Sequence, residues 1–237
     1  MTLNIFKRIR FLIIIVTALA LSMSIHSVPT VYAAEHNTIT IVQESVEIDY
    51  GNKITISITV TSGIDSVESV RALFKPRGGS TVWSYSYPEF STSNMGISLN
   101  LEIPTGPGSY YPPGTEFDIE IEIVDTEGSV SIAKSDESIQ YLDPSKTWKT
   151  AKGNGFSIFY YGIRASKVEN LIAQVNSRIP MLQKVSGVSK TPEFKAIVFP
   201  SVQEATPSFP PISQTATDQL FFAGFAQHNI VYSYRAK

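Results

Sequence analysis

Apolar and polar residues alternate strictly along three stretches of this chain. Residues 54–60, 97–103 and 117–123 carry an apolar side chain at every second position, with short polar or acidic side chains between them. This period of two is typical of strands that turn one face to a core and the other to water. Less regular apolar stretches that predict further strands are residues 38–42, 67–74, 82–87, 130–133 and 138–141.

Turn residues separate these stretches, and no helical pattern interrupts them. Glycine and proline cluster at residues 50–52, 76–79, 106–108, 112–114 and 127–128. Seven or eight short strands with frequent turns predict an all-β, immunoglobulin-like sandwich that spans about residues 36–143.

The first 33 residues have the composition of a secretory signal peptide. Three basic residues at positions 7, 8 and 10 precede an almost wholly apolar stretch at 11–23, and Val31-Tyr32-Ala33 places small side chains before a cleavage point. This three-part pattern predicts export, with the mature protein secreted or held at the cell surface. An uncleaved N-terminal anchor is the alternative, although the apolar stretch is shorter than the ~20 residues that span a bilayer.

Charge and cysteine content exclude several kinds of partner and site. The formal net charge of the 237 residues is −2, and basic residues are scattered after the first ten positions. We therefore expect no nucleic-acid partner, and membrane contact only through the signal peptide or through a C-terminal segment beyond this chain. The chain has no cysteine, so disulfides and thiolate metal sites are excluded.

The pattern changes after Asp143. A strand is expected at 156–161, and residues 166–185 have helical spacing with one apolar stripe: Val168, Leu171, Ile172, Val175, Ile179, Leu182 and Val185. Ser166 with Glu169 predicts a capping box, Gly187 predicts a C-terminal stop, and Pro180 predicts a bend or an interruption of the helix.

Further strands and a short helix are expected after this long helix. The expected elements are strands at 194–199, 222–225 and 230–234 and a short helix that Ser201 and Glu204 cap. This order predicts an incomplete α+β segment over residues 144–237, in which the helix stripe stays exposed.

Several segments together resemble bacterial exported proteins of the peptidase MA-like group, which are gluzincin-type zinc metallopeptidases. The residues that carry the resemblance are Tyr111–Thr115, Ile121–Gly128, Gln140–Pro144, Trp148, Phe156–Gly162, the helix 168–182 with Gly187, Lys195–Ser201 with Glu204, Phe222–Ala226 and Ile230–Tyr234. The resemblance implies a signal peptide, a sandwich domain and then the N-terminal part of a peptidase domain. It also implies that the chain stops before the zinc-binding helix.

The catalytic motif of that family is missing from this sequence. His-Glu-x-x-His binds zinc through two histidines on one helix face and uses the glutamate to activate water. This chain has only His26, His36 and His228, which lie far apart in the sequence. We therefore expect no catalytic residue, no metal ligand and no cofactor in this chain. Zinc is expected only where the part beyond this chain is present.

Two other groups of residues are candidates for binding. Trp83, Tyr85 and Tyr87 alternate along one expected strand and form a possible contact surface, with filling of the sandwich core and covering of its edges as the alternative. The segment Phe222, Ala223, Gly224, Phe225 and Ala226 is a possible peptide-edge strand, with Ile230–Tyr234 as the alternative. An acidic row at 116–127 allows a calcium site, but its alternation along one strand favours a solvated face.

Two functional hypotheses follow. In the first, the chain is the non-catalytic front of an exported zinc metallopeptidase, with the sandwich as spacer or docking module and the last third as scaffold of the cleft. Its partner would be a peptide or protein substrate. In the second, the chain is a secreted or cell-surface binding or adhesion module without enzymatic activity.

Overall fold

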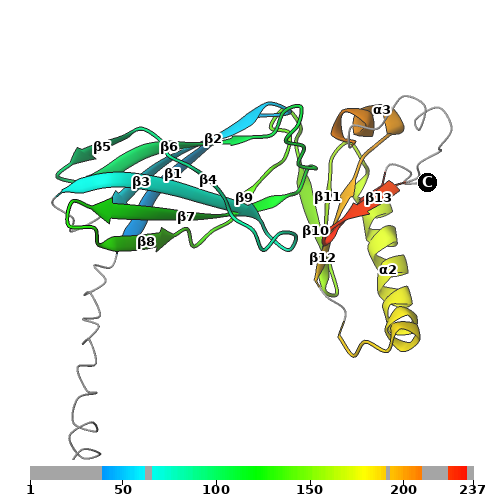
Figure 1. Ribbon diagram of the computed structural model, residues 1–237. Helices are drawn as coiled ribbons and strands as arrows, with labels where there is room; N and C mark the ends of the chain where they lie inside the picture. The colour runs from blue at the N-terminus through cyan, green and yellow to red at the C-terminus, as the bar shows by residue number, and fades with distance from the viewer. Residues whose placement is uncertain (1–38, 62–65, 191–192, 210–223, 234–237) are drawn as a thin grey trace, which may run out of the picture. The chain divides into compact units, whose positions relative to one another are not determined.

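The first half of the described chain consists of antiparallel strands in two sheets. The computed structural model describes residues 39–61, 66–190, 193–209 and 224–233, and Figure 1 labels the elements. The first sheet has the order β1 (Thr40–Asp49), β2 (Lys53–Thr61), β6 (Gly96–Pro104) and β5 (Phe90–Ser93). The second has the order β4 (Ser84–Ser86), β3 (Val67–Pro76), β7 (Glu116–Asp125) and β8 (Val130–Lys134), with β9 (Ile139–Gln140) paired to β7.

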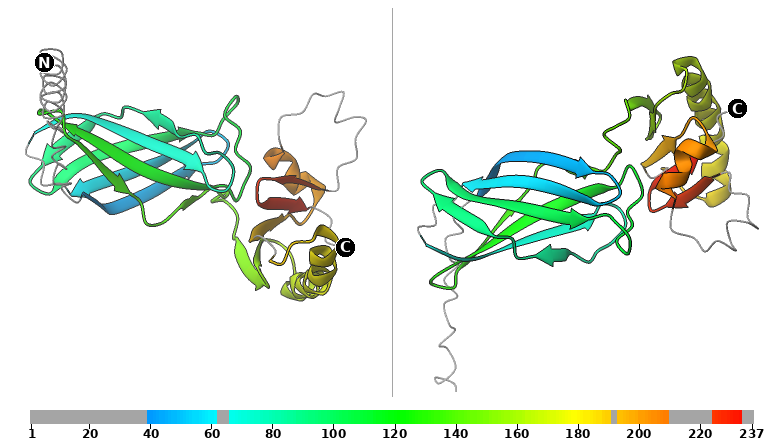
Figure 2. Two further views of the ribbon diagram at one scale, coloured as in Figure 1. Left: turned by 60° about the horizontal axis from the view of Figure 1, so that its bottom comes forward. Right: turned by 90° about the horizontal axis from the view of Figure 1, so that it is seen from above.

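The two sheets stack face to face (Figure 2), and their apolar side chains pack together between them, as the alternation predicts. The apolar members of the three alternating stretches are all buried and belong to one hydrophobic cluster. Their polar neighbours on β2, β6 and β7 point away from that cluster. The prediction of a mainly β, sandwich-like fold is therefore confirmed.

The edge strands of this sandwich differ from the expectation. β1 begins at Thr40 and continues to Asp49, well past the expected end at 42. β5 was not expected, because Phe90 is the only apolar residue among its four. An edge strand packs less of its surface against the core, so its sequence carries a weaker alternation.

The last third of the chain forms a third sheet. Its order is β10 (Lys149–Gly153), β11 (Phe156–Tyr160), β12 (Phe194–Val198), β14 (Ile230–Ser233) and β13 (Gly224–Gln227). The three central strands, β11, β12 and β14, run parallel, and the two outer strands are antiparallel to their neighbours. α2 (Ala165–Ser186) connects β11 to β12, and α3 (Val202–Ala205) and the short η1 (Thr206–Ser208) follow β12.

The expectation that the stripe of the long helix stays exposed is wrong. Val168 and Ile179 of α2 are buried, and Leu171, Ile172 and Val175 pack against the same cluster as β11 and β12. Because α2 links two parallel strands, its crossover places the helix on the face of the sheet (Figure 1). Only the end of the stripe, at Leu182 and Val185, remains exposed.

The ends of the helices agree with the sequence in part. Gly187 ends α2 in the left-handed conformation at φ 70°, and the Ser201 side chain accepts a hydrogen bond from the Glu204 N–H at the start of α3. The capping box expected at Ser166 is absent, because α2 starts at Ala165 and Arg164 occupies the N-cap without a side-chain bond. α2 also continues through Pro180.

Hydrogen bonds join the third sheet and its connections to loops of the sandwich. The described residues belong to one compact unit, Asn37–Lys237. The Tyr232 hydroxyl donates to the Pro113 carbonyl at 2.9 Å, and the Tyr110 hydroxyl donates to the Ser208 carbonyl at 2.8 Å. Burial raises the pKa of the Tyr232 phenol, so the neutral, donating form is favoured.

Candidate functional site

Three aromatic side chains lie on the edge strand β4 and the residues beside it. Tyr85 is opposite Leu73 of β3, whose neighbours Ala72 and Phe74 face the core. Tyr85 therefore points to the outer face of the sheet. Trp83 and Tyr87 lie just outside β4, and the Trp83 ring contacts Lys75 of β3 while the Tyr87 ring contacts the Tyr85 ring. Tyr85 and Tyr87 are 61% and 66% exposed, so the sequence-based alternative that they fill the core does not hold for these two.

Two basic side chains of β3 support this aromatic row. The Lys75 ammonium lies 4.5 Å from the centre of the Trp83 ring, and the Arg71 guanidinium lies 5.8 Å from the centre of the Tyr85 ring. Tyr85 and Tyr87 meet edge to face at 5.9 Å. We call Trp83, Tyr85 and Tyr87 the aromatic platform, because contacts from β3 and between the rings hold it in place.

The sheet face beside the platform carries paired charges. Acidic side chains of β7 form ion pairs at 2.6–2.7 Å with basic residues: Glu122 with Arg71, Asp118 with Arg77, and Glu120 with Lys134. The hydrogen bond to Glu122 raises the pKa of Arg71, which keeps this guanidinium charged. Three members of the acidic row, Asp118, Glu120 and Glu122, are therefore paired with basic side chains beside the platform.

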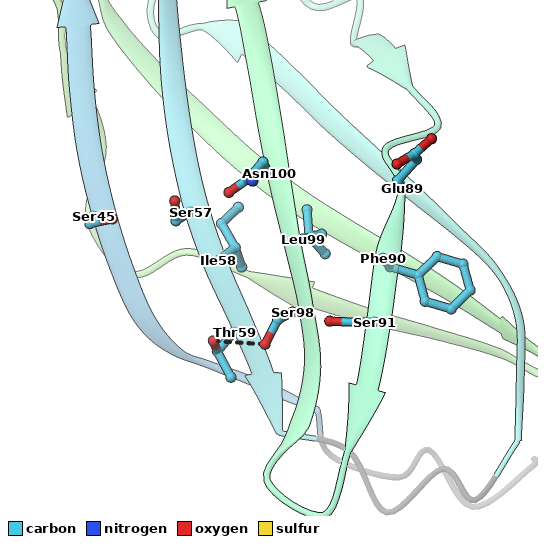
Figure 3. A pocket seen from close by; sticks show the side chains of 10 residues that line it. All are labelled: Ser45, Ser57, Ile58, Thr59, Glu89, Phe90, Ser91, Ser98, Leu99 and Asn100. Carbon is cyan, nitrogen blue, oxygen red and sulfur yellow. Dashed lines mark hydrogen bonds between the residues drawn. The ribbon is translucent and has the colours of Figure 1, made fainter.

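The outer face of the other sheet contains a hollow of about 450 Å³ (Figure 3). Short polar side chains from β1, β2, β6 and β5 line it: Ser45, Ser57, Thr59, Ser98, Asn100 and Ser91. Thr59 and Ser98 share a hydrogen bond at 3.4 Å, and Glu89 is the charged side chain among the described residues that line the hollow. We call this feature the hydroxyl hollow.

One stretch of chain links the platform and the hollow. Tyr87 belongs to the platform, and Glu89, two residues later, lines the hollow. Two residues of extended chain span about 7 Å. The stretch 84–93 leaves the second sheet at β4 and enters the first sheet at β5, so it carries residues of both sites.

The peptide-edge segment of the sequence analysis falls only partly on the described chain. Gly224, Phe225 and Ala226 belong to β13, which is the last of the described strands of its sheet and is antiparallel to β14. The alternative edge at residues 230–234 is wrong, because β14 lies between β12 and β13. Phe222 and Ala223 lie outside the described residues. Phe225 stacks on Tyr232 at 4.2 Å, whereas Ala226 is exposed.

The described residues contain no group of three or more histidine, aspartate or glutamate side chains that could hold a metal ion. His228 occupies the two-residue turn between β13 and β14 with φ 55°. Its ring lies over Gly79, where an added Cβ would come within 2.5 Å of the ring. The His228 ring therefore packs against the backbone at Gly79 of the sandwich. Within the same described ranges, no helix has the length and apolarity needed to cross a bilayer.

Sequence reasoning identified the platform but missed the hollow. Four of the polar residues of the hollow, Ser57, Thr59, Ser98 and Asn100, appear in the sequence as the outward half of two alternating stretches, whereas Ser45 and Ser91 lie outside those stretches. The strand register brings them together, because Ser57 lies between Ser45 and Asn100, and Ser98 lies between Thr59 and Ser91. No protein-family model and no curated protein matches this chain.

Proposed function

We propose that this protein is an exported binding module whose aromatic platform holds a carbohydrate chain. The observation that carries the proposal is the exposure of Tyr85 on the edge strand β4 and of Tyr87 directly after it. Exposed tyrosines at alternate positions of a strand present flat apolar rings with polar ends. A sugar ring matches such a surface, because it has a flat C–H face and a rim of hydroxyls.

Charge also favours an uncharged ligand. The acidic and basic side chains beside the platform are paired, and Lys75 lies against the Trp83 ring. A nucleic-acid site needs an excess of positive charge to replace the counterions of the phosphates. A neutral polysaccharide needs no such excess.

We also propose how the rest of the chain carries the platform. Residues 1–33 would be removed as a signal peptide during export, and the sandwich of about residues 36–143 would be of immunoglobulin-like type. The segment 144–237 would be a separate α+β part. Presentation of a contact surface on a sandwich requires no catalytic group in this chain.

We expect the double substitution Tyr85→Ala/Tyr87→Ala to weaken binding of a neutral oligosaccharide by about 10–30-fold. Each ring removed from a contact site costs on the order of 1 kcal/mol of binding free energy, because its apolar face is no longer covered by ligand. The whole chain, expressed in an exporting host, is titrated calorimetrically with cellohexaose, xylohexaose and chitohexaose.

Val82→Ala is the matched control for this experiment. Val82 is 73% exposed and lies in the same segment, but it is not one of the three platform residues. Its replacement should leave both the affinity and the unfolding temperature unchanged. Oligosaccharide binding that survives the double tyrosine substitution, or absence of binding by the unmodified chain, rejects the platform as a sugar site.

A second candidate function is the non-catalytic front of an exported metallopeptidase, in which β13 receives an extended peptide. The supporting observation is the position of β13 at the edge of a mixed sheet. Gln227 and Ile230 flank the two-residue turn and therefore form a hydrogen-bonded pair of the hairpin. Because such pairs alternate along an antiparallel ladder, the next hydrogen-bonded pair is Phe225 with Tyr232. Ala226 therefore directs its N–H away from β14, where a peptide could accept from it.

This arrangement allows a selective test of the peptide edge. Ala226→Pro removes the outward N–H without removing a bond of the hairpin, whereas Ala226→Val keeps the N–H. We expect Ala226→Pro to weaken binding of labelled casein peptides about tenfold in fluorescence polarisation, and Ala226→Val to leave it unchanged. Equal affinities of the two variants would remove β13 as a peptide site.

A further inference from the structure

A pocket of about 300 Å³ lies at the carboxyl ends of two parallel strands of the third sheet. Tyr161 follows β11 directly, and Phe199 follows β12. The register pairs Tyr160 with Val198, so the two aromatic residues that follow are neighbours at this end of the sheet. In open α/β sheets, ligands bind outside the carboxyl ends of the parallel strands. We call this feature the β11–β12 pocket, and its size suits a compact ligand group.

Three aromatic rings that line this pocket stand nearly at right angles to one another. The ring planes of Trp148, Tyr161 and Phe199 are inclined at 76–89°, and the ring centres are 4.7–6.3 Å apart. Tyr161 and Phe199 are buried in the cluster of the third sheet, which fixes their positions. Tyr50, from the turn between β1 and β2, adds a fourth ring to the lining. Rings arranged in this way offer several faces around one compact group, as in aromatic cages.

Two carboxylates and one ammonium line the pocket beside these rings. They belong to Asp143, Glu204 and Lys146. The Lys146 ammonium pairs with the Glu204 carboxylate at 2.9 Å, and the Tyr161 hydroxyl donates to the same oxygen at 3.0 Å. Hydrogen bonds from Lys146 and Tyr161 lower the pKa of Glu204, which keeps this carboxylate ionised at neutral pH. Among the described lining residues, the formal charges leave an excess of one negative charge.

The position of Lys146 shows that this lining accommodates a cation. Its ammonium lies 5.5 Å from the centre of the Tyr161 ring, and an aromatic face attracts positive charge. A lysine ammonium is strongly hydrated and has three hydrogen-bond donors, so it stays beside Glu204 with 33% of the side chain exposed. A quaternary ammonium carries the same charge without donors. Its methyl groups cover apolar rings, and no hydrogen bond is left unmade.

We propose that the β11–β12 pocket binds a compact quaternary ammonium group, of which the trimethylammonium end of choline is the simplest probe. The rings of Trp148, Tyr161 and Phe199 surround the methyl groups. Glu204 and Asp143 balance the positive charge, and they disfavour a ligand with an anionic group close to the ammonium. The residues of the aromatic platform do not line this pocket, so the inference is independent of the proposed function.

Choline and its uncharged analogue 3,3-dimethylbutan-1-ol test the need for positive charge. The two molecules have the same shape, because a carbon atom replaces the nitrogen. The chain has two tryptophans, so Trp83→Phe leaves the fluorescence of Trp148 as the signal. This variant of the whole chain, from an exporting host, is titrated with each compound at an ionic strength held constant with sodium chloride. We expect choline to bind at least about tenfold more tightly than the alcohol, and equal affinities would overturn the inference.

Two substitutions with opposite expected effects separate ligand binding from a structural role. Glu204→Gln removes a negative charge and leaves Lys146 without its partner, so choline binding should weaken about tenfold. Lys146→Gln removes the competing cation and should strengthen choline binding about threefold. A loss of affinity in Lys146→Gln would contradict the inference. The unfolding temperature of each variant shows whether it folds as the unmodified chain does.

Glu169→Gln is the matched control for the loss of charge. It removes an exposed carboxylate from α2, outside the pocket, and should leave the affinity for choline unchanged. A loss equal to that of Glu204→Gln would show that choline responds only to the net charge of the chain, which overturns the site.

Phosphocholine distinguishes a free quaternary ammonium from a lipid head group. We expect it to bind more weakly than choline, because its phosphate is repelled by the carboxylates of the lining. Phosphocholine that binds as tightly as choline overturns the ligand assignment, and so does absence of choline binding by the unmodified chain. Choline binding that Tyr85→Ala/Tyr87→Ala abolishes would place the cation on the platform instead. Oligosaccharide titrations of Glu204→Gln keep this test separate, since a platform for sugars works without the pocket.

Discussion

Replacement of Ile121 by alanine should lower the free energy of unfolding by about 2–5 kcal/mol, the range for deletion of a large aliphatic side chain from a core. Ile121 of β7 is 0% exposed. Its cross-strand neighbours are Ala72 on β3 and Ala133 on β8. Two alanines cannot extend into the space that the isoleucine leaves, so a cavity remains and the loss should fall in the upper part of the range.

Ile132→Ala is the matched control. It removes the same atoms from the neighbouring strand β8, where Ile132 is 50% exposed. Little apolar surface is lost from the core, so we expect a cost of less than about 1 kcal/mol. Both are measured by urea unfolding followed by circular dichroism. Equal costs for the two substitutions would show that Ile121 is not at the centre of a packed sandwich.

Replacement of Tyr232 by alanine should cost about 3–5 kcal/mol, and replacement by phenylalanine about 1 kcal/mol. Tyr232 is 1% exposed, and its ring stacks on Phe225. Alanine removes the ring and the hydrogen bond to the Pro113 carbonyl, whereas phenylalanine removes only the hydrogen bond. The difference between the two variants therefore separates ring packing from the bond that joins the third sheet to a sandwich loop.

The two tryptophans of the chain report separately on its two parts. Trp83 lies beside β4, and Trp148 packs on Tyr161 at 4.7 Å in the cluster that contains Tyr232. We expect Tyr232→Ala to shift the urea midpoints of both signals together, since hydrogen bonds link the parts within one compact unit. Variants Trp83→Phe and Trp148→Phe isolate each signal. A shift confined to the Trp148 signal would show that the sandwich unfolds independently.

Local periodicity accounts for what could be predicted of the sandwich. Whether a side chain faces the core or water depends on its position within its own strand, so residues 54–60, 97–103 and 117–123 reveal their buried faces directly. The caps at Gly187 and Ser201 could also be predicted, because a cap satisfies backbone groups within a few residues.

Features that depend on a segment far away in the sequence could not be predicted from local periodicity. The stripe of α2 was expected to be exposed, because no local signal shows that β11 and β12 are parallel neighbours that place the helix on their face. β10 was missed, since Lys149–Gly153 alternates weakly and becomes a strand only through its pairing with β11.

The same distinction between local and long-range information applies to the candidate site. The sequence by itself predicted Trp83, Tyr85 and Tyr87 on one side of a strand, because they alternate, whereas the strand contains only Tyr85 and the other two flank it. The tertiary structure decided that this side is the outer one, through the pairing of Tyr85 with Leu73. It also decided that six polar residues from four strands line one hollow, because the register between strands is set by core packing and turns rather than by the outward residues themselves.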